Sequence, residues 1–161
     1  MYILRSRDST IKLWSLKQNN CLHTIECEQG PLESLILLSN GNNISNNSTI
    51  IASCSFHCVK LWTIRARNFD DEISSTFLKG YDFINYYIMS FVCLTASVSE
   101  DGFRFKVCMG LFDGTIHVWN LTKANKMQEH LATFYGHTDS VACIIATDDR
   151  RLIISGSYDG N

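Results

Sequence analysis

The sequence predicts an all-β fold built from one repeated unit, and three observations predict it. Three segments end alike in tryptophan: residues 8–14 (Asp-Ser-Thr-Ile-Lys-Leu-Trp), 57–62 (His-Cys-Val-Lys-Leu-Trp) and 113–119 (Asp-Gly-Thr-Ile-His-Val-Trp). Apolar and polar residues alternate within these motifs, as in a half-buried strand. Turn signals such as Asp-Gly separate short strand-like runs, and no stretch keeps the 3.6-residue apolar period of a helix. Self-similarity of this kind predicts an array of similar strand units.

The repeat divides the chain into four blocks. Residues 2–25 are expected to form an incomplete unit, residues 32–78 and 84–134 two four-stranded units, and residues 141–161 the start of a further unit. The second unit holds two stretches without apolar periodicity, which we expect to be loop insertions: the Asn-rich Ser39–Thr49 and the charged Arg65–Ser75.

Composition bounds the class of protein. The chain has 161 residues, 45% hydrophobic and 19% charged, which suits one ordinary domain or a piece of a larger one. The formal net charge of −2 shows no basic excess, so direct nucleic-acid binding by this segment is not expected. The apolar stretch Phe83–Val98 is shorter than a membrane helix and rich in β-formers, which predicts a buried strand and no membrane association.

The cysteines and the first residues indicate the compartment. Seven cysteines form an odd set without a tight pairing pattern, and charged residues interrupt every apolar run in residues 1–20. We therefore expect reduced core thiols and an intracellular protein, in cytoplasm or nucleus.

These residues resemble WD40 repeats, the four-stranded blades of a β-propeller. Gly136-His137, the Ser-Gly-Ser run that begins at Ser155, Asp159, Asp113 and Trp119 match the pattern of that family. No tryptophan is followed by aspartate, and the blade that ends at Trp62 is one residue short in its turn. The resemblance implies a propeller fragment of about three blades. Closure of the ring would need further blades, from the parent chain or from another copy.

The resemblance also implies a set of bracing residues, because His, Asp, Ser/Thr and Trp form a hydrogen-bonded network within each blade of the family. His137, Ser155 and Asp159 would be such a set, and Asp113 with Trp119 a partial one. Asp8, Trp14 and Trp62 hold the matching positions in the earlier blades. The middle blades are therefore expected to be braced more loosely.

Candidate partner contacts follow from the same resemblance. The residue before the turn aspartate lies on one face of a propeller ring, where relatives often hold partners. Those positions are Arg7, Phe112 and Tyr158, with Phe56 in the shortened blade. Arginine and aromatic residues on an exposed rim suit protein interfaces.

No pattern in the sequence indicates catalysis, a metal or a cofactor. The phosphate-binding glycine motifs are missing, and His57 between Cys54 and Cys58 has no second ligand pair near it in sequence. His137 has no accompanying nucleophile motif. We therefore expect no catalytic, metal-binding or cofactor-binding residues.

The expected function is a non-enzymatic scaffold that binds protein or peptide partners in a larger assembly. Two alternatives stay open. The degenerate blade at residues 54–62 is similar to plant proteins that join a CCCH zinc finger to WD repeats, which would imply nucleic-acid binding through the finger. The other alternative is a substrate receptor of a ubiquitin ligase, which an F-box or RING segment elsewhere would indicate.

Overall fold

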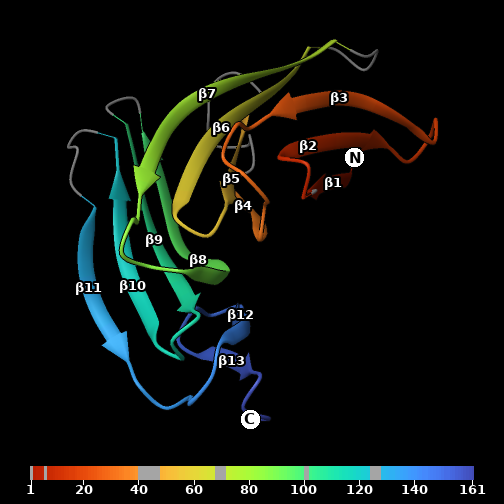
Figure 1. The fold of residues 1–161 in the computed structure, drawn as a ribbon. Helices are drawn as coiled ribbons and strands as arrows, with labels where there is room; N and C mark the ends of the chain where they lie inside the picture. Colours follow the sequence, from red (N-terminus) through yellow and green to blue (C-terminus); the bar gives the residue numbers. More distant parts are fainter. Residues whose placement is uncertain (1, 6, 40–47, 68–71, 100–101, 124–127) are drawn as a thin grey trace.

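The computed structural model describes residues 2–5, 7–39, 48–67, 72–99, 102–123 and 128–161. These residues form thirteen β-strands and no helix, which confirms the all-β prediction. Figure 1 shows the strands grouped into separate antiparallel sheets that follow one another along the chain. Within the described part of the chain, no helix has the length and apolar character needed to cross a lipid bilayer.

The four sheets contain three, four, four and two strands in chain order. The first holds β1 (Tyr2–Arg5), β2 (Thr10–Ser15) and β3 (Asn20–Glu26). The second holds β4 (Ser34–Ser39), β5 (Ser48–Cys54), β6 (Cys58–Arg67) and β7 (Glu72–Asp82). The third holds β8 (Ile88–Ser99), β9 (Gly102–Leu111), β10 (Ile116–Thr122) and β11 (Glu129–Phe134), and the fourth holds β12 (Val141–Ala146) and β13 (Ile153–Ser157).

The repeat that is visible in sequence is also a repeat of backbone geometry. In each of the first three sheets the tryptophan strand pairs with the strand that follows it, and the pairing register shifts immediately before the tryptophan. The shifts fall between Leu13 and Trp14, between Leu61 and Trp62, and between Val118 and Trp119. A bulge at this point increases the local twist of the strand pair. The three sheets are therefore copies of one unit.

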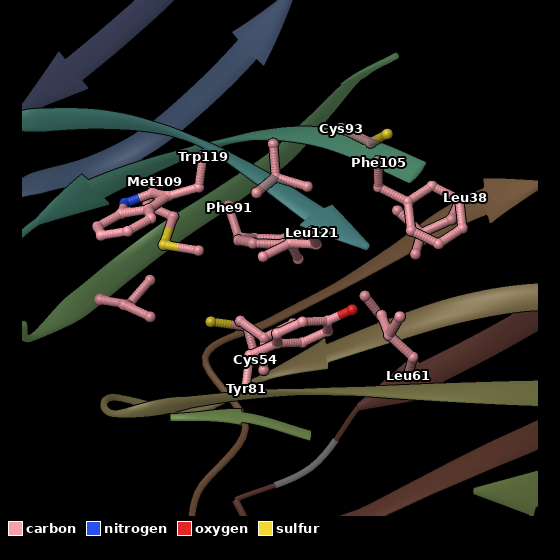
Figure 2. Close-up of a cluster of buried hydrophobic side chains, with 14 of the residues drawn as sticks. Leu38, Cys54, Leu61, Tyr81, Phe91, Cys93, Phe105, Met109, Trp119 and Leu121 are labelled. Atoms are coloured by element: carbon pink, nitrogen blue, oxygen red, sulfur yellow. The ribbon is translucent and has the colours of Figure 1, made fainter. Parts of the chain in front are cut away.

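Neighbouring sheets pack through buried apolar side chains. The largest cluster lies between the second and third sheets, and Figure 2 shows Leu61 and Tyr81 from the second sheet facing Phe91 and Leu121 from the third. Complete burial of a large apolar side chain contributes about 1.5–3 kcal/mol, so the contacts between neighbouring sheets stabilise the array. Smaller clusters join the first sheet to the second and the third to the fourth.

The innermost strands hold the array together. β8 lies against both β4 and β12, and the described sheets form an open arc rather than a closed ring (Figure 1). The Ser90 hydroxyl donates to the Val141 carbonyl oxygen at 2.8 Å, between the third and fourth sheets. Gly110 lies at the same contact, and a Cβ atom there would be 2.6 Å from Cγ1 of Val141. Only glycine permits this close approach of two sheets.

One predicted loop is paired strand for most of its length. The stretch Arg65–Ser75 was expected to be a loop insertion, but Arg65 pairs with Ser74 and Arg67 pairs with Glu72 in the extension of β6 and β7. This prediction was wrong because the charged residues in this extension conceal the apolar–polar alternation of the two paired strands. The other predicted insertion, Ser39–Thr49, lies mostly outside the described residues.

The predicted blocks and the sheets differ slightly at their edges. The second sheet extends to Asp82, beyond the expected limit of residue 78, and the third begins at Ile88. Within the apolar stretch Phe83–Val98, the residues from Ile88 onward form β8, and Phe83 itself is buried before that strand begins.

Candidate interaction surface

A polar network joins the loop before β12 to the turn after β13. His137 Nδ1 lies 3.0 Å from an Asp159 carboxylate oxygen, and His137 Nε2 lies 2.8 Å from the Ser155 hydroxyl oxygen. An ionised carboxylate can only accept, so Nδ1 donates to Asp159, and Nε2 of the neutral ring accepts from Ser155. The backbone N–H groups of Thr138 and Asn161 also donate to Asp159. The network fixes the loop and the turn against each other.

The same hydrogen bonds keep Asp159 ionised. The backbone donors Thr138 and Asn161, followed by His137, lower the pKa of Asp159 from 3.8 to about 2. Two other turn aspartates bond locally: Asp113 accepts from Thr115, and Asp8 accepts from Thr10. Burial raises the pKa of Asp113, but the Thr115 bonds outweigh it and leave this pKa below 3.8. These local bonds shape the tight turns that precede the tryptophan strands.

Trp62 in the second sheet has a polar brace that the sequence analysis did not identify. Its indole Nε1 donates to the Ser53 hydroxyl oxygen at 2.9 Å, and that hydroxyl donates to the Gln29 side-chain oxygen at 3.0 Å. Gln29 thus contacts Ser53 as His137 contacts Ser155. Of the two middle sheets that were expected to be braced more loosely, the second thus has hydrogen bonds that join loop, strand and tryptophan.

Trp119 in the third sheet has no such hydrogen bond and packs against three rings, whereas Trp62 packs against Phe77. The Nε1 of Trp119 is buried without a hydrogen-bond partner, and Met109 occupies the register position that Ser53 has in the second sheet. The rings of Phe83, Tyr86 and His130 pack against Trp119 at centroid distances of 5.3, 5.6 and 4.8 Å. The buried Nε1 of Trp14 is also without a partner, and Leu4 stands at the matching register position of the first sheet.

The structure places three aromatic residues in a row across the second and third sheets. Phe56 stacks on Tyr87 at 4.4 Å between ring centroids, and Tyr87 meets Phe112 edge-on at 5.7 Å. Phe112 is 59% exposed and Tyr87 is 43% exposed, so the row presents ring surface to solvent. We call Phe56, Tyr87 and Phe112 the aromatic row. Tyr87 was missed by the sequence analysis because it lies in a connecting loop outside the repeated motif.

Backbone hydrogen bonds hold the aromatic row in place. The N–H of Ile88 donates to the Phe56 carbonyl oxygen at 2.8 Å, and the N–H of Phe112 donates to the Tyr87 carbonyl oxygen at 2.9 Å. The Ser140 hydroxyl donates to the Phe112 carbonyl oxygen at 3.0 Å. Turns from neighbouring sheets therefore form one connected edge. We call this edge the rim and define it as residues 55–58, 82–88, 111–116, 135–140 and 157–161.

The other two candidate partner residues lie apart from the aromatic row. Tyr158 is 71% exposed and belongs to the rim, where its N–H donates to the Ser140 carbonyl oxygen at 3.1 Å. Arg7 is exposed in the turn that precedes β2 in the first sheet. The rim therefore brings together Phe56, Phe112 and Tyr158, while Arg7 extends the candidate surface into the first sheet.

The cysteine and histidine candidates have ordinary partners. His57 Nδ1 lies 2.7 Å from the Tyr86 carbonyl oxygen, and its ring meets the edge of Tyr87. Burial raises the pKa of the Cys93 thiol to about 11 and that of Cys108 to about 12, so both remain protonated at neutral pH. Across the described ranges, no group of three or more His, Cys, Asp or Glu is placed to hold a metal ion.

The arrangement is that of a repeat protein made of antiparallel sheets, in which turns from neighbouring sheets are hydrogen-bonded along one edge. Residues 128–161 match the family model described as WD domain, G-beta repeat. An uncharacterised WD repeat-containing protein of Schizosaccharomyces pombe is 33% identical over 69 residues, which is 43% of this chain and 18% of that protein. The ribosome biogenesis protein YTM1 of Laccaria bicolor is 22% identical over 147 residues, 91% of this chain and 28% of that protein.

The family model assigns a WD40 repeat to residues 128–161, and the separate antiparallel sheets, which do not close into a ring, are consistent with a WD40 propeller fragment. The chain spans less than a third of the length of both relatives. WD40 repeats generally mediate protein–protein interaction, and the family is typically non-enzymatic.

Proposed function

We propose that this chain is part of a WD40 scaffold whose rim binds a protein or peptide partner. The observation that carries the proposal is the aromatic row, which continues across two sheets and presents ring surface to solvent on hydrogen-bonded turns. Exposed aromatic residues on a rigid frame lose little side-chain entropy on binding and are common interface hot spots. Tyr158 extends the same surface into the fourth sheet.

The bracing residues would act indirectly. His137, Ser155 and Asp159 fix the loop before β12, and Gln29 with Ser53 fixes the corresponding loop of the second sheet. A rigid loop presents its side chains in one arrangement, so partner recognition loses less conformational entropy.

The test is a quantitative comparison of captured proteins. The tagged chain, the variant Tyr87→Ala/Phe112→Ala and the control Leu16→Ala would each be expressed in the organism of origin. Leu16 is a 57% exposed apolar residue that follows β2, at the end of that strand opposite Arg7. A partner of the rim should be depleted at least about tenfold with the aromatic variant and retained with Leu16→Ala. Equal capture by all three proteins would contradict the proposal.

The similarity to YTM1 suggests where to search for the partner. It covers 91% of this chain, and that relative is named for ribosome biogenesis. We propose ribosome assembly as the first cellular context to examine. Co-sedimentation of the tagged protein with pre-ribosomal particles would support this context, and sedimentation only in the light fractions would contradict it.

A further inference from the structure

The rim carries charge of one sign. Its five segments contain four aspartates and not one lysine, arginine or glutamate: Asp82, Asp113, Asp139 and Asp159. Arg104 and Lys106 near the start of β9, and Lys123 after β10, lie toward the opposite ends of their strands. Lys60 lies near the rim end of β6, but its Nζ donates to the carbonyl oxygens of Cys27 and Glu28, and Arg7 lies outside the rim in the first sheet. The rim, which bears the aromatic row, is therefore acidic.

These aspartates and the aromatic row belong to one connected surface. The Ser157 hydroxyl donates to the Asp139 carbonyl oxygen, and Ser140 bonds to both Phe112 and Tyr158. Asp82 ends β7, and the N–H of the following residue, Phe83, donates to the His57 carbonyl oxygen at 2.7 Å. The acidic residues therefore flank the aromatic row on both sides.

The rim stays anionic at neutral pH. Hydrogen bonds hold the pKa of Asp159 at about 2 and the pKa of Asp113 below 3.8. Asp82 and Asp139 are exposed to solvent. Ring faces next to carboxylates attract guanidinium and ammonium groups, since both the ring quadrupole and the carboxylate charge favour a cation. Among the described residues, Lys79 Nζ makes a cation–π contact of this kind, 5.1 Å from the ring centroid of Tyr81.

We propose that the rim recognises a cationic peptide segment, in which arginine or lysine side chains alternate with apolar ones. The apolar side chains pack on Phe112 and Tyr87, while the basic groups lie over ring faces and beside Asp82 and Asp139. This assignment rests on the proposed function and adds the chemistry of the partner. A nucleic acid is disfavoured at this surface because its phosphates would meet the aspartates.

The test uses fluorescein-labelled peptides of defined composition and the 161-residue chain, with binding measured by fluorescence anisotropy. One peptide repeats Arg-Leu-Pro, a second repeats Glu-Leu-Pro and a third repeats Arg-Ser-Pro. We expect the first to bind at least about tenfold more tightly than the other two, because only it offers both charge and apolar surface. Raising the salt concentration should weaken its binding.

Two variants and a control locate the site. Asp82→Asn/Asp139→Asn keeps the shape and should weaken binding of the Arg-Leu-Pro peptide about three- to tenfold and reduce its salt dependence. Phe112→Ala should weaken it about tenfold while leaving part of the salt dependence. Asp148→Asn, an exposed aspartate in the turn between β12 and β13, should change nothing.

The other outcomes separate this inference from the proposed function. Equal or tighter binding of the Glu-Leu-Pro peptide would overturn the cationic assignment, as would rim-dependent binding of poly(U) RNA. Absence of peptide binding would also overturn it. In each of these cases, aromatic-dependent capture of a protein partner would still support the interaction scaffold.

Discussion

The second and third sheets place a tryptophan at the same register position and hold it by different means. Trp62 donates a hydrogen bond to Ser53, which in turn bonds to Gln29. Trp119 has Met109 at the corresponding position and is surrounded by the rings of Phe83, Tyr86 and His130. The difference shows that the repeat specifies the position of the indole ring. The hydrogen bond to the indole N–H is replaced by aromatic packing in the third sheet, and the strand geometry is the same in both sheets.

The two sites differ in whether they offer a hydrogen-bond acceptor to the indole N–H. A buried indole N–H without an acceptor costs free energy, and the three rings that pack on Trp119 offset this cost with apolar contact. The hydrogen bond at Trp62 avoids the cost directly. Both tryptophans are only 7% exposed, so burial alone does not distinguish them.

The largest expected effect is truncation of either ring. Trp62→Ala and Trp119→Ala should each lower the free energy of unfolding by about 3–5 kcal/mol, because a large buried side chain is replaced by a cavity. Urea denaturation of each variant measures this loss. A change below about 1 kcal/mol at either position would show that the ring is not part of the packed seam.

Removal of the polar brace should have a smaller effect that is confined to the second sheet. Ser53→Ala leaves the Trp62 Nε1 and the Gln29 side chain without their partner, so we expect a loss of about 1–3 kcal/mol. In a double-mutant cycle, Ser53→Ala should lower the free energy of unfolding less in the Trp62→Phe background than in the wild-type background. Equal losses in the two backgrounds would contradict the hydrogen bond between Ser53 and Trp62.

A direct contrast between the two indoles sharpens the comparison further. Phenylalanine keeps an aromatic ring but removes the N–H donor. Trp62→Phe should therefore lower the free energy of unfolding by about 0.5–1.5 kcal/mol more than Trp119→Phe does, because the Nε1 donor of Trp119 has no partner to lose. Thermal unfolding of the two variants measures the difference. Equal costs, or a larger cost at Trp119, would contradict the distinction between hydrogen-bonded and ring-packed tryptophans.

The fourth sheet adds a pH-dependent version of the polar brace. The folded-state pKa of Asp159 is about 2, below the ordinary 3.8, so its contribution to stability is present above pH 3.8 and is lost as the pH falls toward 2. Asp159→Asn should make the free energy of unfolding depend less on pH between about 2 and 3.8. Denaturation at successive pH values checks this expectation. The same loss of stability at low pH in the variant as in the wild type would contradict it.

The repeated motifs made much of this fold predictable, and their absence explains what was missed. The segments ending at Trp14, Trp62 and Trp119 indicated strand pairs because strand alternation and turn chemistry act locally. Tyr87 and Gln29 lie in loops, whose contacts depend on how sheets meet and not on any local pattern. The hairpin extension at Arg65 was missed because its pairing is fixed by the partner strand.

The central claim is that the rim, and not the opposite end of the sheets, meets the partner. Site-specific photo-crosslinking tests it most directly, with benzoylphenylalanine introduced at Tyr158 on the rim or at Leu16 at the other end. Both side chains are exposed, at 71% and 57%, so neither replacement disturbs the core. We expect discrete crosslinked protein products from Tyr158 and none from Leu16. Products from Leu16 alone would contradict it.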